Sequence, residues 1–324
     1  MKISILGMGA YGIALGKVFH NNENKVSIWT KFKEELDSVA LVRENVSVLK
    51  GVKIPKAIEL TDNMSKSVEQ ADIVVVAIPM NAVRQVLKEL SEIIEDKQVV
   101  CLVTKGIEEE TGKFVSEIAE EELKGHKNIC MLSGPSIAQE IAEGASTGFV
   151  IASEYEFSSL SVKVCLENKN IVVDISKDLM GVQVASAVKN VFAILCGMLE
   201  GMDKKCSDSL RAAVLSKLVF DLQKIIIYFG GMEETFVGFA GLGDMLLTCM
   251  SNKSRNYTFG KLLGEGKSTN SALKSMNVST IEGLTTLNIL YKILQDKNLK
   301  VKSIDTLYNI VYKDKKIDNV LKNI

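Results

Sequence analysis

One lysine lies in the middle of the most apolar stretch of the chain, residues 181–200. At helical spacing this stretch is apolar on nearly every face, which predicts a helix buried on most sides. Gln183, Ser186 and Asn190 are spaced by three and four residues and share a polar stripe, which Lys189 borders. Burying a charged ammonium is costly unless it is paired or its pKa falls. Lys189 is therefore a candidate catalytic group; the alternative is a lysine whose stem packs while its head reaches water.

A second chemical signal lies at the start of the chain. The β-rich run Lys2–Leu6 leads into Gly7-Met8-Gly9-Ala10-Tyr11-Gly12 and then into an apolar-periodic helix that reaches about His20. A G-x-G-x-x-G turn between a strand and a helix is the fingerprint of dinucleotide binding. The first glycine allows the tight turn, the second lets a pyrophosphate approach, and the third lets helix and strand pack closely. The sequence therefore predicts a dinucleotide site at this turn.

The residues after the second expected strand, Lys25–Trp29, bear on the type of dinucleotide. An acidic residue there would bond the ribose hydroxyls of NAD, but Thr30, Lys31 and Lys33 occupy the region and Glu34 comes only later. A cation at Lys31 would favour the 2′-phosphate of NADP. The alternative is a solvated charge cluster at a helix start, so these residues favour NADP only slightly and do not fix the choice between the two cofactors.

Two more candidates follow expected strands. Lys105 comes just after the buried run Val99–Val103, at the edge where open α/β sheets bind ligands. It is a candidate for contact with an anion or a carbonyl, or else an exposed loop lysine. Ser136 follows the strand pattern Asn128–Leu132. Its hydroxyl either caps a helix or holds a substrate oxygen.

The order of the elements predicts the fold class. Strand and helix patterns alternate up to about Lys177, and long helical periodicity follows. This predicts an α/β Rossmann-like dinucleotide-binding domain over residues 1–177, followed by an all-α C-terminal domain over residues 178–324. The last stretch, Lys297–Ile324, has a Lys-rich amphipathic pattern and predicts a solvated terminal helix.

Composition narrows the class of protein. The chain has 324 residues, of which 39 are Lys or Arg and 40 are Asp or Glu. This net charge near zero argues against nucleic-acid binding, which usually needs an excess of basic residues. Six scattered cysteines without C-x-x-C, and only two histidines, argue against a metal site. Met1 opens directly onto a strand pattern, so we expect no signal peptide. No apolar run is expected to reach transmembrane length, which predicts a soluble cytoplasmic protein without membrane insertion.

The segment Gly238–Gly260 (GFAGLGDMLLTCMSNKSRNYTFG) is the most unusual in the chain. Asp244 suggests a helix start with an acidic first turn, and Ser254-Arg255-Asn256 is a cluster of donors that suits an anion. With this segment, the chain resembles NAD(P)-dependent glycerol-3-phosphate dehydrogenase of the bacterial type. The other stretches that carry the resemblance occur in family order: Gly7–Gly12, Ile78-Pro79 with Arg84, Thr104–Glu108, Ser133–Glu140, Gly181–Val191, Asp208–Val214 and Ile281–Gly283.

The resemblance implies reversible reduction of dihydroxyacetone phosphate to sn-glycerol 3-phosphate by NADH or NADPH, which supplies glycerophospholipid synthesis, with the site in the cleft between the two domains. It implies that Lys189 is the general acid and base, with Asp244 and Lys105 beside it. The substrate-binding positions that it implies are Lys105, Gly134, Ser136, Lys189, Asp244, Ser254, Arg255 and Asn256. The cofactor positions that it implies are Ala10, Tyr11, Lys31, Lys105, Ala138, Arg255, Thr280 and Glu282, with the glycines of the turn. The oligomeric state stays open, with a homodimer as one option.

The chain departs from the family pattern beside the lysine. Gln183 stands where the family has an acid, and Ala185 and Ser186 stand where it has two glycines. These changes bear on the rate and on the choice of cofactor more than on the type of reaction. Two other functions remain open: a related two-domain ketoacid reductase of the ketopantoate type, and a non-catalytic NAD(P)-binding sensor.

Overall fold

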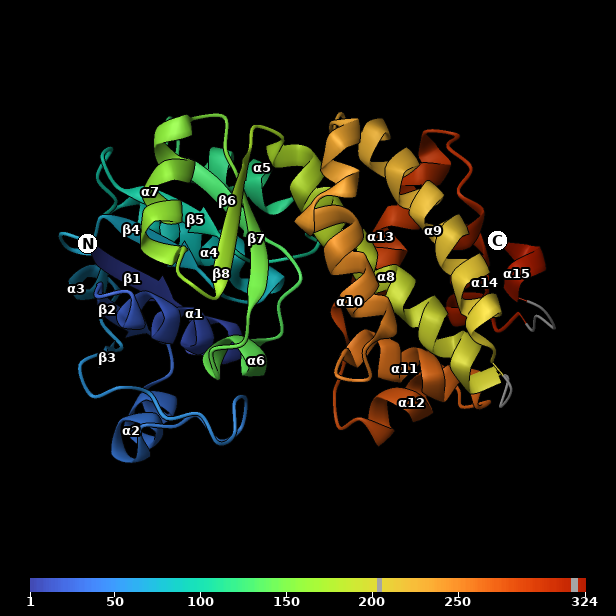
Figure 1. Ribbon diagram of the computed structural model, residues 1–324, viewed down its shortest axis with the longest axis horizontal. Coiled ribbons are helices and arrows are strands. Elements are labelled where there is room, and N and C mark those ends of the chain that lie inside the picture. Colours follow the sequence, from blue (N-terminus) through green and yellow to red (C-terminus); the bar gives the residue numbers. More distant parts are fainter. Residues whose placement is uncertain (203–205, 316–319) are drawn as a thin grey trace. The chain divides into compact units, whose positions relative to one another are not determined.

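The computed structural model describes residues 1–202, 206–315 and 320–324, which form two compact units (Figure 1). The sheet unit comprises Met1–Thr104 and Val115–Leu179, and the helical unit comprises Lys105–Phe114 and Met180–Ile324. The division after Leu179 lies two residues beyond the sequence-based boundary. The segment 105–114 was not foreseen in the second unit, and it brings Lys105 into the helical unit.

An eight-stranded sheet organises the sheet unit, with the order β3-β2-β1-β4-β5-β6-β7-β8. The strands are β1 (Lys2–Leu6), β2 (Lys25–Trp29), β3 (Glu59–Thr61), β4 (Ile73–Val76), β5 (Val99–Leu102), β6 (Ile129–Ser133), β7 (Thr147–Ala152) and β8 (Ile171–Ser176). Neighbouring strands are parallel except β6 and β7, which are antiparallel. The strand order reverses between β1 and β4, where open α/β sheets bind their ligands.

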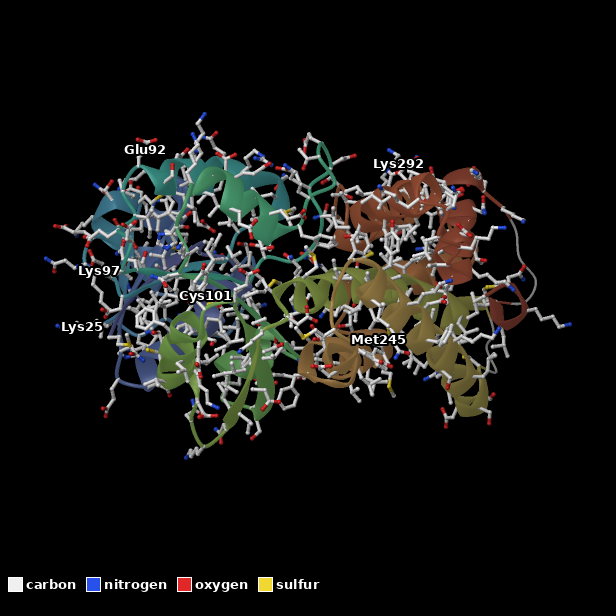
Figure 2. All side chains as sticks on the ribbon, turned by 90° about the horizontal axis from the view of Figure 1, so that it is seen from above. Lys25, Glu92, Lys97, Cys101, Met245 and Lys292 are labelled. Carbon is white, nitrogen blue, oxygen red and sulfur yellow. The ribbon has the colours of Figure 1, made fainter. Side chains whose placement is uncertain are left out.

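The helices of the sheet unit are α1 (Ala10–Asn21), α2 (Lys33–Val42), α3 (Met64–Val68), α4 (Met80–Ser91), α5 (Val115–Glu122), α6 (Ala138–Ala142) and α7 (Glu156–Leu166). The residues of β4 and β5 are buried throughout, because helices leave no face of these central strands to water. Figure 2 shows Lys25, Glu92 and Lys97 pointing outward at the margin of the unit while Cys101 of β5 lies inside it. The α/β dinucleotide-type fold predicted for this part is confirmed.

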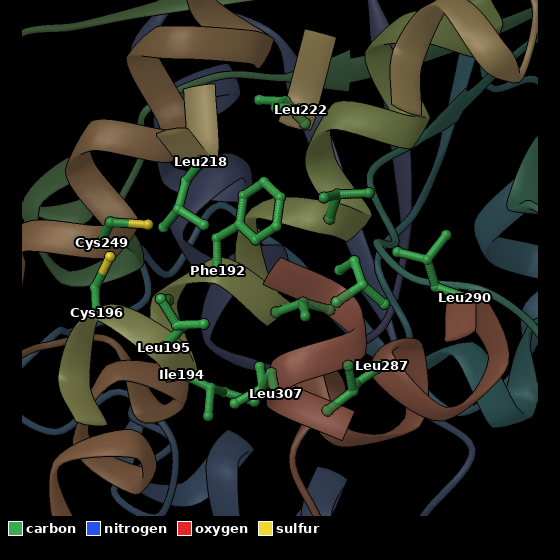
Figure 3. Packing of buried hydrophobic residues seen from close by; sticks show 14 of the residues in the cluster. Phe192, Ile194, Leu195, Cys196, Leu218, Leu222, Cys249, Leu287, Leu290 and Leu307 are labelled. Atoms are coloured by element: carbon green, nitrogen blue, oxygen red, sulfur yellow. The ribbon is translucent and has the colours of Figure 1, made fainter. Parts of the chain in front are cut away.

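The helical unit is built around α8 (Leu179–Met202), whose residues from Gly181 to Leu199 are all buried. The other helices are α9 (Asp208–Tyr228), α10 (Asp244–Met250), α11 (Arg255–Gly264), α12 (Thr269–Ser275), α13 (Glu282–Asp296), α14 (Lys302–Lys313) and α15 (Val320–Asn323). Phe192 of α8 lies against Leu218 of α9 in the core, and leucines of α13 and α14 close its other side (Figure 3). The predicted all-helical C-terminal part is confirmed.

Two expectations about the helical unit were wrong. The helix α8 is long and apolar enough to cross a membrane by length and composition, but 89% of its most apolar window is buried inside the protein. Its apolarity is that of a central core helix, packed on all sides. The stretch expected to form one solvated terminal helix instead contains α14 and α15, and α14 buries Ile304, Leu307 and Val311 in the core.

Candidate active site

Three charged side chains meet in the helical unit. Asp244, at the start of α10, accepts a hydrogen bond from Lys189 Nζ on its Oδ1 and one of 3.1 Å from Lys105 Nζ on its Oδ2. The exposed side-chain fractions are 7% for Lys189, 15% for Lys105 and 0% for Asp244. The lysine of the apolar helix is therefore almost wholly buried, and neither lysine is an exposed surface residue. Residues that are 55 and 139 positions from Asp244 thus converge on one carboxylate.

Burial and a second cation change the acidity of this lysine. The pKa of Lys189 is lowered from 10.5 to about 8: burial is the main cause, Asp244 opposes the shift, and Lys105 adds to it. A lysine with a pKa near the working pH can both give and take a proton, which an unperturbed lysine cannot do efficiently. A lowered pKa beside a buried carboxylate suits an acid–base group, and buried structural ion pairs also show such shifts.

The chain around Asp244 explains why its carboxylate points inward. A π-helical turn, Phe239–Gly243, precedes α10, and a Cβ on Gly241 would lie 2.2 Å from the carbonyl oxygen of Phe236. Only glycine allows this close passage of the two backbone segments. One turn further on, the Thr248 hydroxyl donates to the Asp244 carbonyl at 2.7 Å and lies 3.4 Å from its Oδ1. Sequence reasoning did not identify Thr248.

Lys105 reaches the carboxylate because of the segment that follows it. Ile107 and Phe114 form an antiparallel bridge, and both side chains belong to the core of the helical unit. Phe114 also packs edge-on against Phe229, with ring centroids 5.3 Å apart. These apolar contacts fix the segment to the helical unit and thereby hold Lys105 beside Asp244. No sequence signal marked this segment as part of the second unit.

A second polar cluster joins α8, α11 and the start of α13. Asn190 Nδ2 donates to Glu282 Oε2 at 3.1 Å, and the buried Asn256 side chain accepts the backbone N–H of Gly283 at 3.0 Å. Arg255 lies 3.9 Å from Glu282, and the two side chains are 67% and 51% exposed. Arg255 and Glu282 are thus an exposed pair, whereas the buried Asn256 helps to fix the backbone at Gly283.

Two further predicted binding residues, Ser254 and Thr280, lie at or just before the start of a helix. Ser254 is the N-cap of α11, and its hydroxyl accepts the N–H of Tyr257 at 3.3 Å. Its hydroxyl therefore already satisfies one of the free donors of the helix start. Thr280 is exposed in the connection before Ile281, which is the N-cap of α13.

The departures from the family pattern lie inside the core of the helical unit. The Ser186 hydroxyl donates to the Val182 carbonyl at 2.8 Å within the same helix, and Gln183 Nε2 lies 3.4 Å from the sulfur of Met180. Both side chains are buried, as is Ala185. The added groups are therefore accommodated within the packing of α8 and its neighbours.

The glycine turn of the sheet unit has the geometry that its sequence predicts. A Cβ on Gly7 (φ +128°) would lie 2.2 Å from the Ala77 carbonyl oxygen, and a Cβ on Gly12 would lie 2.1 Å from that of Gly7. A Cβ on Gly9 would meet nothing within 4 Å. Gly9 is also the N-cap of α1 and offers no side chain to its first-turn N–H groups. The turn therefore leaves space beside Gly9 at a helix start that no side chain caps, and its residues fit a dinucleotide pyrophosphate.

Ser136 lies beside this turn and does not cap a helix. The N-cap of α6 is Ile137, so the capping role for Ser136 was wrong. Its hydroxyl instead donates to the Gly134 carbonyl at 3.0 Å and lies 2.9 Å from the Tyr11 hydroxyl. Gly134 has a φ of +144°, and a Cβ there would lie 2.5 Å from the Gly148 carbonyl oxygen. Tyr11, Gly134 and Ser136 thus form one polar group, and Ala138 begins the adjacent α6.

The end of β2 contains polar contacts that the sequence did not show. Lys31 pairs with Glu89 of α4 at 3.2 Å. Glu35, in the first turn of α2, accepts hydrogen bonds from the Thr30 hydroxyl and from Asn45 Nδ2. Asn45 Nδ2 also donates to the Met8 carbonyl inside the glycine turn at 3.1 Å. Glu35 and Asn45 were not among the candidate residues, because a tertiary contact rather than sequence spacing brings them there.

Comparison with known proteins bears on both units. The family model described as NAD-dependent glycerol-3-phosphate dehydrogenase N-terminus matches residues 2–158, and the one for the C-terminus matches residues 178–322. A glycerol-3-phosphate dehydrogenase [NAD(P)+] from Fusobacterium nucleatum is 34% identical over 317 residues, covering 97% of this chain and 93% of that protein. The crystal structure of glycerol-3-phosphate dehydrogenase from Coxiella burnetii is similar with a TM-score of 0.91 at 27% identity, covering 99% of this chain and 97% of that one.

The fold and these matches first define a class: proteins that join a dinucleotide-type α/β unit to an all-helical unit. Within that class, the chain belongs to the NAD-dependent glycerol-3-phosphate dehydrogenase family. The ketopantoate-type alternative has less support. A ketopantoate reductase structure from Ralstonia eutropha has a TM-score of 0.61 at 12% identity, which is a likeness of fold alone.

Proposed function

We propose that this chain catalyses the reversible NAD(P)H-dependent reduction of dihydroxyacetone phosphate to sn-glycerol 3-phosphate. The observation that carries the proposal is the buried Lys189, paired with Asp244 beside Lys105, in a chain of this family. The proposal assigns cofactor binding to the sheet unit (residues 1–177 in the sequence-based division) and the acid–base group to the helical unit. Glycerophospholipid synthesis is the process that we propose the product supplies.

Lys189 is the general acid in this proposal. When bound, the nicotinamide supplies the hydride to the ketone carbon. Negative charge then builds on the ketone oxygen, and Lys189 stabilises it and gives it a proton; in the oxidative direction Lys189 takes the proton back. Asp244 orients the ammonium through its hydrogen bond. Lys105 donates to the other oxygen of the same carboxylate and adds to the lowering of the Lys189 pKa that burial mainly causes.

Arg255 and its neighbours hold the substrate phosphate in this proposal. The planar guanidinium can bind a phosphate through two parallel hydrogen bonds, and its present partner Glu282 is 3.9 Å away at an exposed position. Asn256 and Ser254 hold the backbone around Arg255, and Gly134 and Ser136 are the substrate contacts proposed for the sheet unit. Binding energy from a remote phosphate can be used to position the reacting carbonyl.

The cofactor residues proposed for the sheet unit are the turn Gly7–Gly12 with Ala10 and Tyr11, and Lys31 and Ala138. Those proposed for the helical unit are Lys105, Arg255, Thr280 and Glu282. The space beside Gly9 and the uncapped start of α1 support the pyrophosphate position. We also propose that the protein works in the cytoplasm on a small-molecule substrate, without nucleic acid and without insertion into a membrane. The balanced charge of the chain and the packing of α8 support this.

Cofactor oxidation by the purified protein tests the proposal. We expect turnover of NADH or NADPH with dihydroxyacetone phosphate and none with unphosphorylated dihydroxyacetone or ketopantoate. Lys189→Ala should keep cofactor binding and lose most turnover, by about 10²–10⁴-fold for a removed acid–base group. Turnover on ketopantoate would favour the ketoacid reductase, and cofactor binding without turnover on any substrate would favour the sensor.

Arg255→Ala separates the phosphate role from the acid–base role. Because its ion pair with Glu282 is exposed, we expect the unfolding midpoint to stay unchanged while the KM for dihydroxyacetone phosphate rises. An unchanged KM would move the phosphate site to another residue.

A further inference from the structure

A carboxylate lies at the end of β2, although the sequence places no acidic residue there. β2 ends at Trp29, and α2 begins at Lys33. The first turn of α2 folds back so that the Glu35 carboxylate accepts a hydrogen bond from the buried Thr30 hydroxyl. Thr30 is itself fixed by its N–H bond to the Thr61 carbonyl at 3.0 Å. A carboxylate therefore does lie at the end of β2, and it comes from five residues beyond Thr30.

The same carboxylate is joined to the glycine turn. The buried Asn45 side chain donates through Nδ2 to Glu35 Oε1 at 2.9 Å and to the Met8 carbonyl at 3.1 Å. The N–H of Gly7 in turn bonds the Trp29 carbonyl at 2.9 Å. One amide thus fixes the distance between the carboxylate and the turn that fits a pyrophosphate. In dinucleotide folds the adenosine ribose is bound between these two elements.

The cations near this strand end are already paired with acids. Lys31 lies 3.2 Å from Glu89, and Lys33 lies 3.2 Å from Asp37 and 3.7 Å from Asp62. A 2′-phosphate needs an unopposed cation at this place, which NADP-binding folds supply with a basic residue. Here each lysine that could supply it has a carboxylate within 4 Å. The local charge favours a cofactor without the additional phosphate.

We propose that Glu35 binds the hydroxyls of the adenosine ribose and makes this chain prefer NADH to NADPH. An ionised carboxylate only accepts hydrogen bonds, and each of its oxygens accepts two. Thr30 occupies one position on Oε2 and Asn45 one on Oε1, so acceptor capacity is left for a ribose hydroxyl. A 2′-phosphate would meet a like charge at the same place, which discriminates against NADPH. The inference rests on the proposed function, because it requires a dinucleotide at the glycine turn.

Binding of the two cofactors without substrate tests this inference. The dissociation constants of NADH and NADPH are measured by cofactor fluorescence for the wild type, Glu35→Gln and Glu34→Gln. Glu34 is the matched control, since it loses the same charge from the exposed neighbouring position of α2. We expect the wild type to bind NADH about tenfold or more tightly than NADPH, as for one hydrogen bond to a charged group. Glu35→Gln should reduce that ratio about tenfold, and Glu34→Gln should change it less than about twofold.

The outcomes separate this inference from the proposed function. If the wild type binds NADPH as tightly as NADH, the role of Glu35 is overturned and the dehydrogenase proposal stays intact. The same holds if the ratio of the two dissociation constants is unchanged in Glu35→Gln. This wild-type ratio decides the question even where Glu35→Gln fails to fold. Lys31→Gln is the second test: a tenfold loss of NADPH affinity in this variant would show that Lys31 selects the cofactor. Failure to bind either cofactor would overturn the proposed function itself.

Discussion

The two units hold their candidate residues by opposite physical means. In the sheet unit, the turn at Gly7–Gly12 works by shape, because missing side chains let backbones meet and leave room beside Gly9. In the helical unit, Lys189, Asp244 and Lys105 work by charge, in a cluster that is mostly buried. A conservative substitution should therefore act sterically in the sheet unit and electrostatically in the helical unit.

The largest expected effect follows from removing the shared charge. Asp244→Asn keeps the shape of the side chain but leaves a buried lysine ammonium without its counter-charge. Removing one partner of a buried pair costs about 3–5 kcal/mol, and turnover should fall at the same time because the ammonium loses its orientation. Urea unfolding and steady-state kinetics measure both effects. Asp37→Asn is the control, since its pair with Lys33 is exposed and its loss should leave the unfolding midpoint unchanged. A stable, active Asp244→Asn protein would contradict the electrostatic account.

Shape in the sheet unit is tested by a pair of glycines. Gly12→Ala places a Cβ 2.1 Å from the Gly7 carbonyl oxygen, so the turn must move. We expect a loss of about 1–3 kcal/mol of stability, as for other overpacked sites, together with weaker NADH binding. Gly9→Ala has open space around its Cβ and a φ of −75° that alanine adopts. It should fold normally and weaken only cofactor binding, because the Cβ enters the space left for the pyrophosphate. Equal stability losses in the two variants would argue against this division.

The pH dependence of the reaction sharpens the electrostatic half of the comparison. Burial and Lys105 lower the pKa of Lys189 to about 8. Reduction needs this lysine protonated, so kcat/KM for dihydroxyacetone phosphate should fall as the pH rises through about 8. Lys105→Met removes a cation that lowers the pKa, so the fall should move to higher pH. A pH profile that is the same in both proteins would exclude Lys105 as an influence on Lys189.

The same shift predicts a pH dependence of stability with a definite sign. The folded-state pKa of Lys189 is about 8, and the ordinary value is 10.5. Between these values the unfolded chain binds the proton and the folded protein does not, so the free energy of unfolding rises with pH. Below about pH 8 both states are protonated, and the whole penalty of the buried charge is present. Lys189→Met should remove this dependence, which unfolding curves at pH 8 and 10 would detect.

The sequence predicted local structure well where the chain itself marks the limits of an element. The bounds predicted for β1 and β2 are those of the structure, because these β-rich runs end at a glycine and at a polar residue. The glycine turn was equally readable, since Gly7 and Gly12 each allow a close backbone contact and Gly9 leaves space for a ligand.

The sequence could not predict contacts made between distant segments. Nothing local shows that residues 105–114 pack with the helical unit, because Ile107 and Phe114 look like ordinary apolar residues. Nor does any spacing bring Glu35 to the end of β2. The pairing of Lys189 with Asp244 entered only through family resemblance, since the polar stripe on its own also fitted a lysine that reaches water.

The smallest expected effect concerns a departure from the family pattern, and it tests whether the helical unit works by charge alone. Ser186→Gly restores the family residue in the middle of α8. Glycine costs about 0.5–1 kcal/mol in a helix interior, so stability should fall slightly. The Ser186 hydroxyl donates to the Val182 carbonyl of its own helix and carries no charge. Because it lies outside the ion-pair cluster, kcat should stay within about twofold of the wild-type value, and the pH profile should not change. Stability comes from urea unfolding, with Ser216→Gly on the exposed face of α9 as the control, because its hydroxyl makes the same i–4 bond at 2.8 Å. A severalfold change in kcat would mean that packing next to Lys189, and not charge alone, sets the rate, and the division between the two units would then hold only for the sheet unit.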